Sequence, residues 1–199
     1  RNAILSFSDM ELVDENGREL FPSFFNYRKL DPEPAHPLNQ LLSFNYITGC
    51  SICMNRRLVG LGIPLPPSAI MHDWWFSLIA SACGDLFYNP KALLAYRQHP
   101  KNLIGANGEI ALIRNINGWG EAWRRGGCEL AATYDQASSL LNRLEERKSL
   151  GKSVGKLLNL YAGMPKMSRI ERIFSVRKLK LRDQKMLLKL ILFLRLLTS

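Results

Sequence analysis

Cysteine is scarce in this chain, and the few cysteines do not have the spacing of a metal site. The 199 residues hold Cys50, Cys53, Cys83 and Cys128. Only the first two have a C-x-x-C spacing, and they lie in an alternating stretch, 46–54, that predicts a strand. Side chains three apart on a strand point to opposite faces, and no second close pair completes a zinc site. We therefore expect reduced, buried cysteines, as in a cytosolic protein.

Acidic residues are outnumbered, and the imbalance is concentrated near the end of the chain. Lys and Arg number 27 against 17 Asp and Glu, a formal net charge of +10. Residues 165–199 hold ten basic and two acidic side chains, and so +8 of that total. This basic segment is rich in Leu and Ile and lacks the interleaved aromatic residues on which bases stack, so we expect no nucleic-acid partner.

The chain also lacks an apolar run long enough to cross a bilayer. The most apolar stretch, 186–197, predicts a last helix that is interrupted by Lys189 and Arg195. Two alternatives stay open for it. The helix packs on this domain or on a second copy, giving a homodimer through the C-terminal helices, or it lies in a membrane interface with its basic residues on anionic lipid. Because Arg1 stands where an initiator Met would, we expect that the chain begins inside a longer protein.

The first hundred residues alternate between strand and helix patterns. An apolar run at 3–8 predicts a buried strand that delivers Asp9 at its end, and 14–17 predicts a turn after a second extended piece, 11–13. A helical turn is expected at 56–59. Strands are expected at 46–54, 85–88 and 93–98. This alternation predicts an α/β sheet up to about residue 98.

From residue 109 onward the pattern is helical. Apolar residues recur at spacings of four and three, as on a helix packed against a neighbour: Leu130, Tyr134, Ala137, Leu141 and Leu144. Ser168 followed by Glu171 is a capping box that predicts the start of a further helix. We expect Ile170, Ile173 and Phe174 to face inward from it.

Asp73 lies where a proline-rich loop is expected to pass into a helix. Pro64, Pro66 and Pro67 precede it, and a mostly apolar segment runs from Trp74 to a stop at Gly84. One interpretation is an N-cap aspartate over a core helix. The other is a general base between aromatic faces, which suits a polyhydroxylated substrate because sugar C–H faces pack on rings while the carboxylate accepts a hydroxyl proton.

Five segments, in this order, resemble family-2 glycosyltransferases. They are Phe7-Ser8-Asp9 with 12–17, Asn45-Tyr46-Ile47-Thr48-Gly49-Cys50, Asn55-Arg56, His72-Asp73-Trp74-Trp75, and Tyr96-Arg97-Gln98-His99. The resemblance covers roughly residues 3–105. It is closest to the rhamnosyltransferase-like bacterial group that builds surface polysaccharides.

The resemblance implies a GT-A (Rossmann-like) fold and an inverting transfer from a nucleotide-sugar donor. Residues 1–108 would form the acceptor-side half of the domain, and 109–199 a helical extension with a basic amphipathic tail. The sugar would be rhamnose or a related deoxysugar, and the acceptor a saccharide or lipid-linked saccharide. The expected location is the cytoplasm, peripheral on the inner face of the plasma membrane.

The resemblance also implies roles for particular residues. Asp73 would deprotonate the acceptor hydroxyl, and His72, Trp74 and Trp75 would lie around the substrate. Tyr46, Thr48 and Gly49 match the segment that lines the sugar and acceptor site. Arg97 would meet the charge of the diphosphate, and His99 is a candidate metal ligand. The divalent cation, Mg or Mn, would have its main ligands upstream of this chain.

The nucleotide-binding strands and the Asp-x-Asp motif of the family have no counterpart in this sequence. We therefore expect residues 1–199 alone not to turn over. The alternative function is a non-catalytic scaffold that docks a glycan-assembly complex to the membrane. The catalytic interpretation requires that the Asp73 carboxylate can be reached from a cleft.

Overall fold

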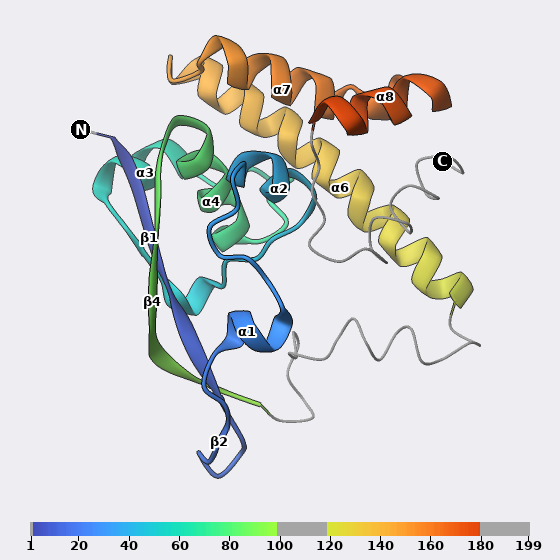
Figure 1. The fold of residues 1–199 in the computed structure, drawn as a ribbon. Coiled ribbons are helices and arrows are strands. Elements are labelled where there is room, and N and C mark those ends of the chain that lie inside the picture. The colour runs from blue at the N-terminus through green and yellow to red at the C-terminus, as the bar shows by residue number, and fades with distance from the viewer. Residues whose placement is uncertain (1, 99–118, 180–199) are drawn as a thin grey trace.

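A mixed four-stranded sheet forms one side of the molecule. The computed structural model describes residues 2–98 and 119–179, with side chains omitted for 119–129. Strand β1 (Ala3–Val13) is central. β2 (Glu19–Phe21) and β3 (Ile52–Met54) pair antiparallel along one of its edges, and β4 (Gly84–Arg97) pairs parallel along the other (Figure 1). The expected α/β class is confirmed by this mixture of sheet and helices.

Two pairs of predicted strand segments are each one long strand. The stretches 3–8 and 11–13 join as β1, so Asp9 lies within a strand and not at its end. The stretches 85–88 and 93–98 join as β4. The strands stay paired because β4 accommodates extra residues at two irregularities: Asn89 is opposite Ser8 but Ala92 is opposite Asp9, and a further residue is added before Ala95, which is opposite Glu11. Such a bulge lets a strand continue past a proline, here Pro90. The predicted 14–17 turn is confirmed by the bond from Gly17 N–H to the Asp14 carbonyl.

The strand predicted over 46–54 is mostly wrong. Only its last three residues form a strand, β3, and they follow a 3-10 turn, η1 (Gly49–Ser51). Ser51 N–H closes this turn on the Thr48 carbonyl, which takes these backbone groups away from a sheet ladder. Cys50 and Cys53 are exposed and Cys83 is half-buried, so the expected burial of the cysteines is wrong for these three, although all are free thiols.

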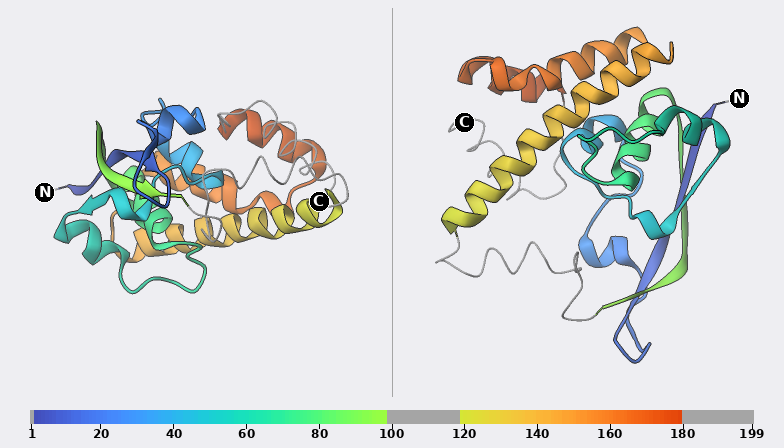
Figure 2. Two further views of the ribbon diagram at one scale, coloured as in Figure 1. Left: turned by 90° about the horizontal axis from the view of Figure 1, so that it is seen from below. Right: turned by 180° about the vertical axis from the view of Figure 1, so that it is seen from behind.

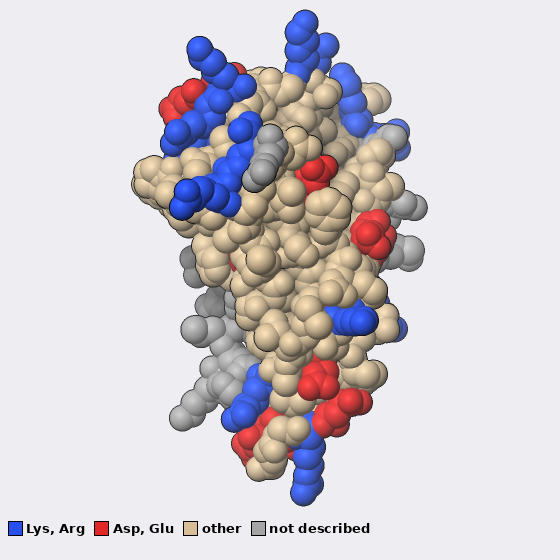
Figure 3. Space-filling model, turned by 90° about the vertical axis from the view of Figure 1, so that its left-hand side faces the viewer, with Lys and Arg blue, Asp and Glu red and all other residues tan. Residues whose placement is uncertain are grey.

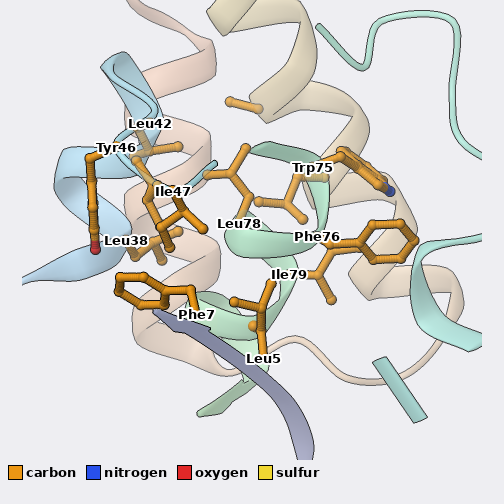
Figure 4. Packing of buried hydrophobic residues seen from close by; sticks show 14 of the residues in the cluster. Leu5, Phe7, Leu38, Leu42, Tyr46, Ile47, Trp75, Phe76, Leu78 and Ile79 are labelled. Carbon is orange, nitrogen blue, oxygen red and sulfur yellow. The ribbon is translucent and has the colours of Figure 1, made fainter. Parts of the chain in front are cut away.

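Four short helices lie on the inner side of the sheet. They are α1 (Phe24–Arg28), α2 (Pro37–Ser43), α3 (Arg56–Gly62) and α4 (His72–Cys83). Leu5 and Phe7 of β1 face Leu78 and Ile79 of α4, and together they lie near the centre of the core (Figure 4). The predicted stop of α4 at Gly84 is confirmed. A Cβ at Gly84 would lie 2.0 Å from the Ala3 carbonyl oxygen, so only glycine fits there.

One long helix and two shorter ones cover the far side of these four helices (Figure 2). They are α6 (Trp119–Glu146), α7 (Lys152–Ala162) and α8 (Arg169–Leu179), with a 3-10 turn, η3 (Met164–Lys166), before α8. The predicted stripe on α6 is confirmed, since all five positions are buried or half-buried. The hydrophobic core is one cluster that runs from the sheet to α7 and α8. Arg143 of α6 adds hydrogen bonds to the Leu61 and Pro64 carbonyls.

The capping box before α8 is confirmed, but the predicted inward face is wrong. Ser168 N–H binds the Glu171 carboxylate at 2.8 Å, while Ile170 and Phe174 are 68% and 64% exposed. The helix is oriented by Arg172, which donates to the carbonyls of Met164, Pro165 and Met167 and holds its own face against η3. The predicted last helix, 186–197, lies outside the described residues. Within the described residues, no helix has the length and apolar content needed to cross a membrane.

The side of the molecule on which β1 and β4 lie is largely uncharged in its middle. Figure 3 shows this face, where most of the charged side chains gather toward the two ends.

Candidate functional site

Asp73 is the second residue of α4, close to where the proline-rich loop ends. The N-cap is Met71, which makes no side-chain capping bond, so the N-cap interpretation of Asp73 is wrong. The Asp73 Oδ1 atom accepts a hydrogen bond of 2.8 Å from the Trp74 backbone N–H. The carboxylate therefore lies at the positive end of the helix dipole without capping the helix.

The turn η1 covers Asp73. A Cβ on Gly49 would lie 2.8 Å from His72 Nε2 and 3.4 Å from Asp73 Cβ, so the turn packs closely on the start of α4, and any larger residue at position 49 would require the exposed His72 side chain to move. Asp73 is 2% exposed, whereas His72 is exposed. The requirement that the Asp73 carboxylate be reachable from a cleft is therefore not met in this conformation of the chain.

Asp9 provides a comparison, since it is a buried aspartate with a full set of donors. Its Oδ1 accepts from the backbone N–H groups of Met10, Phe24 and Phe25 at 2.8, 3.1 and 3.4 Å. Its Oδ2 accepts from the Ser23 hydroxyl at 2.5 Å. Burial, followed by the charge and hydrogen bond of Asp9, raises the pKa of Tyr88 to about 12. Asp9 thus ties β1 to the start of α1 and is accounted for by structure alone.

Asp73 has far fewer partners than Asp9. Trp74 N–H is the only donor to its carboxylate within the described parts of the chain, and Oδ2 has none. Ser77 Oγ–H binds the backbone carbonyl of Asp73, not its side chain. A buried carboxylate normally accepts several hydrogen bonds or pairs with a cation, because its desolvation is otherwise uncompensated. The Asp73 side chain therefore has unused acceptor capacity at Oδ2.

The two tryptophans do not form an aromatic wall around this carboxylate. Trp75 is 0% exposed and donates its indole N–H to the Gly62 carbonyl at 2.9 Å, so in this conformation it belongs to the core, and its expected role in substrate binding stays a prediction. Figure 4 shows it within the hydrophobic cluster. Trp74 is half-buried, and its indole N–H binds the Leu41 carbonyl at 2.6 Å. Neighbouring helix positions point about 100° apart, which is why only one of the two indoles enters the core.

Of the predicted residues in 45–50, Gly49 lies beside Asp73. Tyr46 is 3% exposed and its ring meets that of Phe7 edge-on, with centroids 6.3 Å apart, so in this conformation it packs in the core, and its expected contact with substrate stays a prediction. Burial, and then Asp31, raise the pKa of its hydroxyl. Thr48 and Gly49 belong to the covering turn, where Thr48 Oγ1 lies 3.0 Å from Ser51 Oγ.

The end of β4 approaches the same turn. Burial of Tyr96, and then the neighbouring Cys50, raise the pKa of the tyrosine, while Arg28 opposes them. Arg97 follows on β4 as an exposed residue opposite Val13. His99, the candidate metal ligand, lies outside the described residues. Residues 2–98 and 119–179 contain no group of three His, Cys, Asp or Glu side chains arranged to hold a metal ion.

Comparison with known proteins does not assign the chain to a family. No protein-family model, no curated protein and no solved structure matches it.

Proposed function

We propose that this chain supplies the acceptor side of an inverting glycosyltransferase, with Asp73 as the general base. The donor is a nucleotide-sugar carrying rhamnose or a related deoxysugar, and the acceptor is a saccharide or lipid-linked saccharide. The observation that supports this best is the buried Asp73 carboxylate, which has one hydrogen bond where Asp9 has four. A buried polar group with few hydrogen-bond partners requires an explanation, and a catalytic role is one such explanation.

A second observation is that separate segments of the resemblance meet at one place. The turn Gly49–Ser51 packs on His72 and Asp73, and Met10 of β1 lies against it, with its sulfur 3.6 Å from Thr48 Oγ1. Tyr96 of β4 reaches the same turn from the other strand. Two segments of the resemblance that are far apart in sequence, 45–50 and 72–75, are therefore in contact, and Tyr96 of a third is close enough to Cys50 to be influenced by it.

The chemistry of the proposal is a single displacement. The Trp74 N–H holds Oδ1, which leaves Oδ2 to accept the proton of the acceptor hydroxyl as its oxygen attacks the anomeric carbon. The bond from that carbon to the diphosphate breaks, and the configuration inverts. Arg97 would meet the negative charge of the leaving diphosphate. The residues that the structure describes do not form a metal site, so no step of this displacement is assigned to a cation.

The proposal requires the covering turn to move. At 2% exposure, Asp73 is too enclosed for a sugar hydroxyl to reach Oδ2 while η1 lies on it. The turn itself is closed by local bonds between Ser51 and Thr48, and it can shift as a unit without breaking them. Acceptor binding would then displace the turn and expose the base.

The test uses protein expressed from the complete reading frame that contains this sequence. It is incubated with dTDP-rhamnose, UDP-glucose, UDP-N-acetylglucosamine or GDP-mannose, Mg²⁺ or Mn²⁺, and a bacterial glycolipid extract, and release of the nucleoside diphosphate is followed. D73N should lower transfer by about 10²–10⁴-fold with donor affinity nearly unchanged. D85N is the matched control, since Asp85 is a half-buried carboxylate of β4 bound to Asn2. Transfer by D73N at the unmodified rate would refute the proposal.

The enclosure of Asp73 favours a second candidate, the non-catalytic scaffold of a membrane-bound glycan-assembly complex. A scaffold makes no use of an unpaired carboxylate oxygen. Complementation of a deletion strain separates the two, because a scaffold with D73N restores surface polysaccharide, whereas a transferase with D73N does not.

A further inference from the structure

The outward face of α8 carries two large apolar side chains. Ile170 and Phe174 are 68% and 64% exposed, which are the largest values for any large hydrophobic residue among those described. They are four residues apart, so they lie about 40° from each other on one face of the helix. A monomeric soluble domain gains nothing from exposing this pair.

Basic residues surround the pair. Arg169, Arg177 and Lys178 of α8 are exposed, and Lys166 of the preceding turn is exposed as well. At about 100° per residue, Arg177 lies close to the direction of Ile170 and Lys178 close to that of Phe174. The acid of this helix, Glu171, is bound to Ser168, and its pKa lies below the ordinary value for that reason.

The opposite face of α8 is fixed to the rest of the molecule. Ser175 and Leu179 are buried, and the Asn39 side chain binds the Leu179 carbonyl. Arg172 also belongs to this inner side, since it donates to three carbonyls near η3. These contacts fix the orientation of α8 about its own axis, so the apolar pair and the neighbouring basic residues point outward.

We propose that this face of α8 docks on the surface of an anionic lipid bilayer. Ile170 and Phe174 enter the headgroup region, and Arg169, Arg177 and Lys178 lie on the negatively charged lipids. A bilayer fits this face better than a protein groove does, because the cations are spread around the apolar pair and a diffuse negative surface can meet all of them at once. The inference depends on α8 alone and not on Asp73.

The experiment is co-sedimentation of the whole protein with large unilamellar vesicles. Vesicles of 30% phosphatidylserine in phosphatidylcholine are compared with pure phosphatidylcholine. We expect binding to the anionic vesicles that weakens with salt. Since each surface cation contributes about 1 kcal/mol, or roughly a fivefold change in partitioning, R177Q/K178Q should weaken binding about thirtyfold. I170S/F174S should weaken it at least tenfold.

The matched control is K152Q/K156Q, which removes two exposed cations from α7. It should weaken binding far less than R177Q/K178Q does. Equal losses would show an unspecific charge effect and overturn the proposal, and so would equal binding to pure phosphatidylcholine. The melting temperature of I170S/F174S should match that of the unmodified protein. A fall of several degrees without lipid would show that residues 180–199 or a second copy cover this face, which also overturns it.

Discussion

Replacing the two buried aspartates by asparagine should affect stability to very different extents. Asparagine has nearly the same shape as aspartate, so neither substitution creates a cavity. D9N removes the charge to which three backbone N–H groups and the Ser23 hydroxyl donate. D73N removes a charge with one donor, Trp74 N–H, and the amide oxygen of asparagine can still accept that bond.

The expected magnitudes follow from these contacts. Hydrogen bonds to a charged group are worth about 1.5–3 kcal/mol each and roughly half of that when the group is neutral. With four donors weakened or mismatched, D9N should lower the free energy of unfolding by about 2–4 kcal/mol. For a chain of this length that corresponds to about 5–15 °C in Tm. D73N keeps the one bond that the side chain accepts, from Trp74 N–H, so its Tm should stay within about 3 °C of that of the unmodified protein.

The assay is thermal unfolding at neutral pH, followed by circular dichroism at 222 nm and by calorimetry. D85N is again the control for loss of one negative charge. If D73N lowered the Tm as much as D9N does, Asp73 would be a structural residue, and the reasoning from its unpaired oxygen would be wrong. If D9N left the Tm unchanged, the assignment of Asp9 to the link between β1 and α1 would fail.

Three further predictions concern the neighbours of the site and α8. G49A should lower the Tm by a few degrees, because the added Cβ meets His72 Nε2 at 2.8 Å, and H72A in the same background should restore part of the loss. W75F should cost about 2–4 kcal/mol of unfolding free energy in chemical denaturation, since it removes a buried ring edge and the bond to Gly62. Ser168 keeps the pKa of Glu171 below its ordinary value. At a pH above that ordinary value, the ionised carboxylate therefore stabilises the start of α8. This contribution is lost as the pH falls through the lowered value, and E171Q should abolish the corresponding loss of helicity in acid.

Each of these predictions has a contrary outcome. A G49A protein with unchanged stability would show that the turn already lies away from His72. Unchanged stability in W75F would place the indole outside the core. An acid transition that is the same with glutamine at position 171 would mean that other carboxylates carry it.

The sequence predicted those elements whose local signals were strong. The stop of α4 at Gly84, the 14–17 turn, the α6 stripe and the Ser168–Glu171 box each depend on residues that are close in the chain. For each of them a local pattern, whether helix periodicity, a turn residue or a cap, indicates the backbone state directly.

Other features depended on contacts between distant residues. The inward side of α8 is set by Arg172 and the η3 carbonyls, which no apolar pattern reveals. α1 was missed although Ser23 is its N-cap, because its five residues are too few for a periodic signal and Asp9, a distant residue, stabilises its start.

For the candidate site, the sequence predicted which segments meet, but not which side chains are buried. Segments 45–50 and 72–75 do meet around Asp73. The burial of Tyr46 and Trp75 could not be predicted, since a motif position does not show which aromatic ring packs in the core. The hydrogen-bond donors to Asp9 could not be predicted either. Three of them lie 14–16 positions further along the chain, and no sequence pattern connects them to Asp9.

The central claim is that the Asp73 carboxylate removes a proton from a sugar hydroxyl. The most direct measurement is the single-turnover transfer rate of D73N beside its affinity for the donor, both in protein from the complete reading frame. The account predicts a rate at least a hundredfold lower with the donor dissociation constant nearly unchanged. A rate within about threefold of the unmodified protein would contradict it.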